Sequence, residues 1–84
     1  MSYWTLDGNY ENYYDYSRGV VEGGGLSLEL VLTMDLEGRR ASIKPRLIGE
    51  DIEPDIPSIP IAWGDARTML GNAPFAYLFE GGAA

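Results

Sequence analysis

Hydrophobic and polar residues alternate most regularly between Leu26 and Leu36. Leucine or methionine occupies every even position of this stretch, and serine, glutamate, threonine and aspartate occupy most of the odd positions. A repeat of two residues is typical of a β-strand that buries one face and exposes the other. The stretch therefore predicts a strand whose even-numbered side chains belong to the core.

A second strand follows directly and completes a hairpin. The polar turn 37–39 leads into 40–48, which again alternates. Its apolar positions on one face are Ala41, Ile43 and Leu47. Pro45 has no backbone N–H to donate, which places this strand at an edge of the sheet or at a bulge. We therefore predict a long central antiparallel hairpin over about 26–48.

The segments before this hairpin have weaker patterns. Residues 2–6 predict a short strand, and Asp7-Gly8 predicts a tight turn after it. Residues 9–16 fit either a strand or a helical turn that begins at Asn12. The three consecutive glycines at 23–25 predict a turn or a hinge, because they cannot specify a regular element.

The segments after the hairpin predict one short helix and one more strand. The prolines of 50–60 favour an extended chain. Residues 65–70 predict a helix with Asp65 as its N-cap and Gly71-Asn72 as its end. The apolar run at 75–79 predicts a last strand. Additional short strands are thus expected near both ends of the chain.

Length and composition limit the chain to one small domain. Its 84 residues leave no room for a second core, so 1–84 is predicted to be a single β-rich α+β domain, with 81–84 as a frayed tail. Cysteine and histidine are both absent. Disulfides, thiolate chemistry, Ser/His/Asp triads and the usual zinc sites are therefore excluded. We expect a protein that is not an enzyme and that has no cofactor or metal.

The charge is negative and unevenly distributed. The net charge is −7, with −6 in residues 1–38, +4 in 39–49 and −5 in 50–84. Such a field repels nucleic acid and anionic lipid and attracts basic proteins. The N-terminal sequence has no signal-peptide pattern, and no apolar run is long enough to cross a bilayer. We expect a cytoplasmic protein, in the host cytoplasm if a phage encodes it, that binds neither nucleic acid nor membranes directly.

The segment YENYYDYSRG, at 10–19, combines four tyrosines with two acids. Rings that stack nucleic-acid bases lie in a positive groove, whereas these rings lie among acids. Tyrosine is typical of protein-binding surfaces, and core packing accounts for only part of the cluster. The predicted partner-binding residues are Tyr10, Glu11, Tyr13, Tyr14, Asp15 and Tyr16, together with Glu50, Asp51, Glu53 and Asp55.

These features predict a small inhibitor that binds a basic, nucleic-acid-handling protein. Carboxylates at alternate strand positions are about 6–7 Å apart, which is similar to the spacing of successive phosphates. The protein would thus mimic DNA. In size and charge the chain is similar to small phage-encoded inhibitors of host defence nucleases, including some anti-CRISPR proteins. The alternatives are a self-assembling structural or adaptor protein of the virion type and a toxin immunity protein. Monomer and homodimer both remain open.

Overall fold

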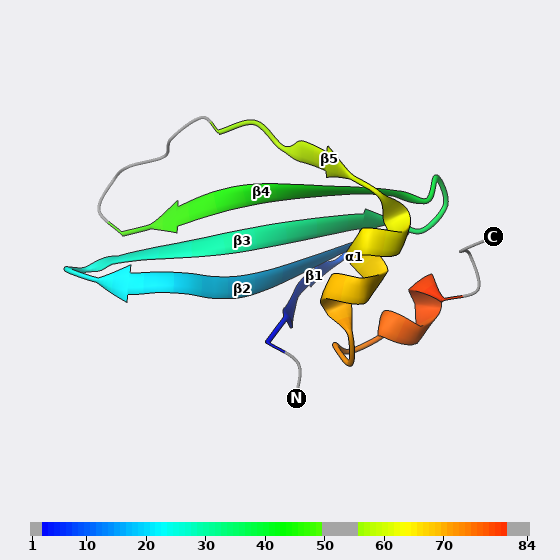
Figure 1. Ribbon diagram of the computed structural model, residues 1–84, viewed down its shortest axis with the longest axis horizontal. Helices are drawn as coiled ribbons and strands as arrows, with labels where there is room; N and C mark the ends of the chain where they lie inside the picture. Colours follow the sequence, from blue (N-terminus) through cyan, green and yellow to red (C-terminus); the bar gives the residue numbers. More distant parts are fainter. Residues whose placement is uncertain (1–2, 50–55, 81–84) are drawn as a thin grey trace.

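An antiparallel sheet of five strands forms the frame of the computed structural model, which describes residues 3–49 and 56–80. The strands lie side by side in chain order (Figure 1). They are β1 (Thr5–Asn9), β2 (Tyr13–Gly23), β3 (Leu26–Asp35), β4 (Arg40–Ile48) and β5 (Ile59–Ile61), and α1 (Trp63–Leu70) and the 3-10 turn η1 (Ala76–Phe79) follow. The predicted β-rich α+β fold and its central hairpin are confirmed.

The β2–β3 hairpin, which precedes the central one, is closed by a turn that requires glycine. Gly24 and Gly25 join β2 to β3 and both have positive φ, at 60° and 79°. Residues with a β-carbon rarely adopt this conformation, and paired positive φ values match the right-handed twist of hairpin strands. The glycine run therefore sets the turn. The strands on either side pair along their whole length, with a register shift between Gly19 and Val21.

The two faces of the sheet differ in character. On the face that packs against α1 and η1, here called the helical face, Tyr16 of β2 is opposite Leu32 of β3, and Leu32 is opposite Ile43 of β4. The opposite face, here called the polar face, carries the odd positions of β3, such as Glu29 and Thr33. The even positions of β3 thus share the core-facing side, as the alternation predicts.

The helices cover only one end of the helical face. Figure 1 shows α1 and η1 over the end of the sheet near β1, while the other end of the hairpin extends past them. Phe79 is the main anchor of this layer: its ring centroid lies 5.6 Å from that of Trp63, 5.5 Å from Tyr14 and 6.3 Å from Tyr16. The buried core residues are Trp4, Tyr16, Leu32, Met34, Ala41, Ala66, Leu70, Ala73 and Phe79.

The C-terminal part differs from the prediction. The strand predicted at 75–79 is wrong, because Phe75 is in the left-handed region (φ 63°) and 76–79 form a 3-10 turn that inserts Phe79 into the core. The helix starts at Trp63, and its N-cap is Ala62, which makes no side-chain cap bond. Asp65 instead lies in the first turn, where its carboxylate interacts favourably with the positive end of the helix dipole.

The N-terminal part also differs. The tight turn predicted at Asp7-Gly8 is wrong: β1 runs through both residues with a register shift between Leu6 and Gly8. The chain reverses at Tyr10–Tyr13, whose backbones exchange N–H···O bonds of 2.8 and 3.3 Å. A β-carbon on Gly8 would lie 3.3 Å from the Tyr10 ring, so the glycine makes room for that ring. The helical-turn alternative for 9–16 does not occur.

Candidate protein-binding surfaces

The tyrosine segment divides between the core and the surface. Tyr16 is 0% exposed, and its hydroxyl donates a hydrogen bond to the carbonyl oxygen of Pro74. Tyr14 is partly buried on the same face, between the rings of Phe75 and Phe79. Tyr16 is therefore a core residue that no partner reaches. A sequence period of two placed these rings on one face but did not show that η1 covers it.

Tyr10, Glu11 and Tyr13 remain on the surface, at the turn between β1 and β2. Tyr10 is 63% exposed and Tyr13 is 47% exposed. The turn is tied to the β3–β4 turn by two bonds of 2.7 Å, one from Leu36 N to Asn12 O and one from Asn12 Nδ2 to Glu37 Oε2. Three of the six partner-binding residues predicted at 10–16 are therefore accessible to a partner.

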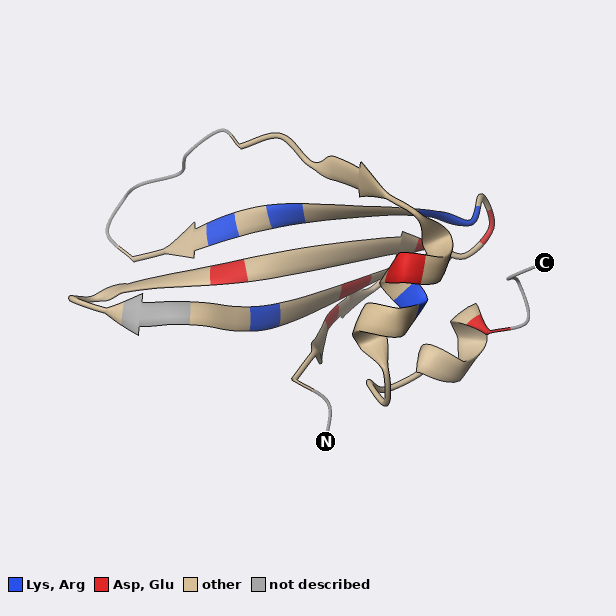
Figure 2. Ribbon diagram, in the orientation of Figure 1, with Lys and Arg blue, Asp and Glu red and all other residues tan. Residues whose placement is uncertain are grey.

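The acids of the polar face have partners within the chain. Asp15 is half-buried and accepts a 2.8 Å hydrogen bond from Thr33 Oγ1. Arg46 donates to Asp7 at 2.9 Å and to Glu29 at 2.7 Å. Hydrogen bonds to Asp7 and Glu29 raise the pKa of Arg46 above its usual value. Figure 2 shows basic residues interspersed with acidic ones along the described strands.

Several acids on the described strands are already bonded within the chain, which limits their use as phosphate mimics. Phosphate mimicry requires carboxylates that are free to meet a partner's Lys and Arg residues. On the described strands, Asp7, Asp15 and Glu29 already have partners. The second half of the predicted set, Glu50, Asp51, Glu53 and Asp55, lies outside the described residues, as does the tail 81–84.

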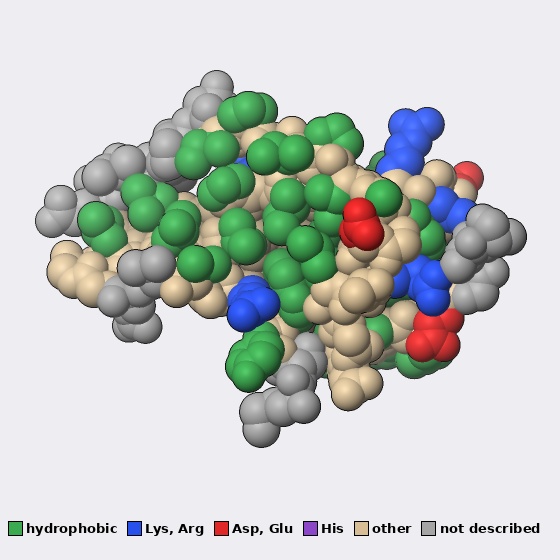
Figure 3. All heavy atoms as spheres, viewed as in Figure 1, with side chains coloured by type: hydrophobic (Ala, Val, Ile, Leu, Met, Phe, Trp, Pro, Cys, Tyr) green, Lys and Arg blue, Asp and Glu red, His purple; other side chains and the backbone are tan. Residues whose placement is uncertain are grey.

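The uncovered end of the helical face is mostly apolar, with Arg18 of β2 opposite Leu30. In the register, Leu30 is opposite Pro45, and Leu28 is opposite Leu47. Leu26, the first residue of β3, is 36% exposed, and the other four are half-buried. Figure 3 shows hydrophobic side chains gathered from beside α1 towards this end of the sheet. We call this surface, formed by Leu26, Leu28, Leu30, Pro45 and Leu47, the open face.

The open face exists because the helical layer covers only one end of the hairpin. Figure 1 shows that α1 crosses the strands instead of running along them, so the helix covers a width of about 10 Å along each strand. A strand of ten residues such as β3 is about 33 Å long. The long axis of the molecule measures 43 Å. Alternation in β3 and β4 identifies the apolar side chains of this face, but no sequence signal shows that α1 stops before reaching them.

The edges beside the open face are poorly suited to strand addition. β1 pairs with β2 only as far as Ser17, and β5 pairs with β4 only as far as Ile43. Beyond these points β2 carries Arg18 and the bulge, and β4 carries Lys44 and Pro45. Charged residues, bulges and proline are the features that protect edge strands from pairing. At this end the exposed apolar face is therefore better suited to contact with another molecule than the strand edges are.

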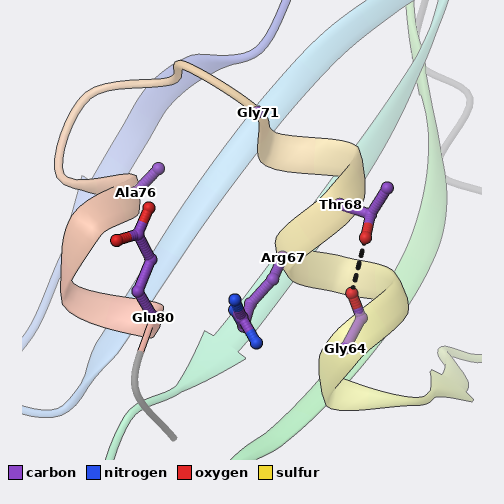
Figure 4. A pocket seen from close by; sticks show the side chains of 6 residues that line it. All are labelled: Gly64, Arg67, Thr68, Gly71, Ala76 and Glu80. Atoms are coloured by element: carbon purple, nitrogen blue, oxygen red, sulfur yellow. Dashed lines mark hydrogen bonds between the residues drawn. The ribbon is translucent and has the colours of Figure 1, made fainter. Parts of the chain in front are cut away.

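A pocket of about 150 Å³ lies between α1 and η1 (Figure 4). Arg67 and Glu80 contribute opposite charges to its lining, and Thr68 Oγ1 donates a 3.0 Å bond to Gly64 O. Buried Nε of Arg67 has no hydrogen-bond partner. The pocket is smaller than typical small-molecule sites, which measure about 300–1,000 Å³. Its lining contains no nucleophile paired with a base.

Metal and membrane features are not found in the part of the chain that the structure describes. No group of three or more acidic side chains in residues 3–49 and 56–80 is placed to hold a metal ion. No helix in the same ranges has the length and apolarity needed to cross a membrane. Comparisons with protein-family models, with curated proteins and with solved structures find nothing that matches this chain.

Proposed function

We propose that this chain is a non-enzymatic inhibitor that docks a basic partner protein on its open face. The observation that carries the proposal is the mismatch between the helical layer and the hairpin, which leaves Leu26 and Leu28 outside the core of the described residues, whereas Leu30 packs against the core at the border of the open face. Contiguous apolar surface on a small protein marks an interaction site. Docking would remove this surface from water at about 25 cal/mol per Å².

The charge of the chain favours a basic partner. The net charge is −7, and four of the acids lie in 50–55, which begins two residues after the end of β4 at Ile48. A partner that binds this chain would therefore meet an excess of carboxylates. Lys and Arg at the rim of its binding site would be attracted by them. A nucleic-acid-handling protein has such a basic rim, so these acids would stand in for phosphates.

The surface at Tyr10, Glu11 and Tyr13 offers a second contact. These residues lie at the turn between β1 and β2, at the opposite end of the hairpin from Gly24-Gly25. Exposed tyrosine rings provide contact area at low entropic cost. Glu11→Lys reverses one charge at this turn. We expect it to weaken capture of a basic partner several-fold, without changing the fold.

The test is a capture experiment with matched variants. Ser27 and Leu28 are neighbours in β3 and lie on opposite faces. Tagged wild-type protein, Leu28→Lys and Ser27→Lys are each incubated with extract from cells that naturally express the chain. Bound proteins are identified by mass spectrometry. Circular dichroism and thermal melting show whether each variant is folded.

The proposal predicts a basic protein that is bound by wild type and Ser27→Lys and lost with Leu28→Lys. Binding should weaken as salt increases, because screening reduces the attraction between charges. A protein retained equally by both variants would contradict docking on the open face. Recovery of only the chain itself, lost with Leu28→Lys, would identify a second copy as the occupant and favour a self-assembling protein.

A further inference from the structure

Three aromatic rings form a continuous surface where η1 meets β2. The ring centroids of Tyr14 and Phe75 are 6.0 Å apart, and those of Phe75 and Tyr77 are 6.4 Å apart. Both pairs are tilted by 44°. Phe75 is 42% exposed and Tyr77 is 66% exposed. We call this surface, formed by Tyr14, Phe75 and Tyr77, the aromatic wall.

Phe75 adopts an unfavourable backbone conformation to take this position. Its φ of 63° and ψ of 10° lie in the left-handed region, where a bulky residue is an outlier. The surrounding chain holds it there. Ala76 N donates to Ala73 O at 3.0 Å, and Leu78 N donates to Phe75 O at 2.9 Å. Glycine or asparagine would adopt this positive φ with less strain than phenylalanine. The aromatic ring at this position is therefore the feature that needs an explanation.

Core packing explains only part of the wall. Phe79 is the ring of η1 that fills the core, and it is fully buried. Tyr14 contacts both Phe79 and Phe75, so it connects the core to the wall. Phe75 and Tyr77 lie further out, and much of each ring remains accessible to solvent. The accessible area is what a ligand would meet.

The chemistry of the wall suits a delocalised cation. Accessible ring faces attract a guanidinium through their quadrupole, and Arg is the commonest partner in such contacts. The chain already contains one example: Arg18 Cζ lies 5.0 Å from the ring centroid of Tyr3. The net charge of −7 further favours a cation over an anion.

We propose that the aromatic wall binds an arginine side chain of a protein partner. The choice of a protein as the source of this arginine rests on the proposed function, whereas affinity for the guanidinium does not. The guanidinium would lie over the rings of Phe75 and Tyr77. This site adds recognition of one basic side chain to the apolar docking on the open face.

The experiment measures binding of two small probes by NMR chemical-shift titration of the ¹⁵N-labelled full chain. One probe is N-acetyl-arginine methylamide. The other is N-acetyl-citrulline methylamide, which has nearly the same shape without the charge. We expect saturable shifts at residues 73–80 with the arginine probe and at least fivefold weaker binding of the citrulline probe.

Substitutions then locate the site. Phe75→Leu and Tyr77→Leu keep apolar side chains but remove a ring, and each should weaken arginine binding about two- to fivefold, which corresponds to the strength of an exposed cation–π contact. The double variant should lose measurable binding. Tyr3→Leu is the matched control, because it removes an exposed ring elsewhere. Thermal melting shows whether each variant is folded.

The proposal is overturned if the arginine probe gives no saturable shift, or if the two probes bind equally. It is also overturned if the double variant binds the arginine probe as well as Tyr3→Leu does. Leu28→Lys should leave probe binding unchanged. Absence of arginine binding at the aromatic wall would therefore not contradict docking on the open face. Likewise, a negative capture experiment would not contradict arginine binding at the wall.

Discussion

The two ends of the central hairpin have the same alternating sequence but different surroundings. At the end covered by α1 and η1, Leu32 and Met34 of β3 are fully buried. At the other end, Leu28 and Leu30 of the same strand are half-buried. The residue types and their spacing are alike, so the difference comes from what lies above each end. Alternation shows which side chains share a face, and the position of α1 and η1 on the sheet decides which of them become core.

The comparison assigns different roles to the two ends. The covered end contains the buried residues and supplies the stability of the fold. The open end contributes less to stability and presents apolar surface. Substitutions can therefore separate the two roles, because those at the covered end should change folding and those at the open end should change binding.

The largest effect is expected at the covered end. Leu32→Ala removes a fully buried side chain and should lower the free energy of unfolding by about 2–5 kcal/mol, through lost burial and a cavity. Urea unfolding monitored by circular dichroism measures the change. A loss below about 1 kcal/mol would show that the helical layer does not form a tight core over Leu32.

Alkaline pH should weaken the same end. Burial, and then the neighbouring Tyr14, raise the pKa of Tyr16 from 10.0 to about 12. Between these values the unfolded chain loses the Tyr16 proton while the folded chain keeps it. Stability is therefore complete below pH 10 and falls as pH rises through about 12, by about 2–3 kcal/mol. Urea unfolding across this range should show the decline in wild type and a smaller one in Tyr16→Phe; equal declines would contradict the assignment.

A smaller effect on stability is expected at the open end. Leu28→Ala removes a half-buried side chain, so it should cost about 1 kcal/mol, well below Leu32→Ala. The same urea experiment compares the two variants directly. Equal costs at Leu28 and Leu32 would mean that the open end is packed as tightly as the covered one, and the distinction between them would fail.

The smallest effect is expected on the polar face. Arg46→Gln breaks the ion pairs with Asp7 and Glu29 and should cost about 0.5–1 kcal/mol, because the pairs are partly exposed. Added salt should reduce the difference between wild type and variant. A larger loss that does not depend on salt would show that Arg46 acts through packing instead.

Much of the fold was predictable from local patterns. The alternation of Leu26–Leu36 specifies the central hairpin, and the glycines at 23–25 specify the turn before it. Pro45 predicts an edge or a bulge, whereas β4 is an internal strand and Pro45 lies where β5 no longer pairs with it. The errors lie where tertiary contacts decide. The run at 75–79 has strand composition, but insertion of Phe79 among Tyr14, Tyr16 and Trp63 bends it into a 3-10 turn.

The candidate surfaces were less predictable. Tyrosine content identified a segment with binding potential, and Tyr10 and Tyr13 remain exposed. No local signal separated them from Tyr16, because burial of that ring depends on η1, which is about sixty residues away in the chain. No local signal identified the open face either. Its alternating pattern predicts core, and its exposure depends on where α1 crosses the sheet.

The most direct test of the account is site-specific photocrosslinking at neighbouring positions. A photoreactive amino acid replaces Leu28 on the open face or Ser27 on the polar face, and each variant is irradiated in cells that naturally express the chain. The account predicts a covalent adduct with a basic protein from position 28 and none from position 27. An adduct from position 27 alone, or equal adducts from both positions, would contradict the claim that the open face is the docking surface.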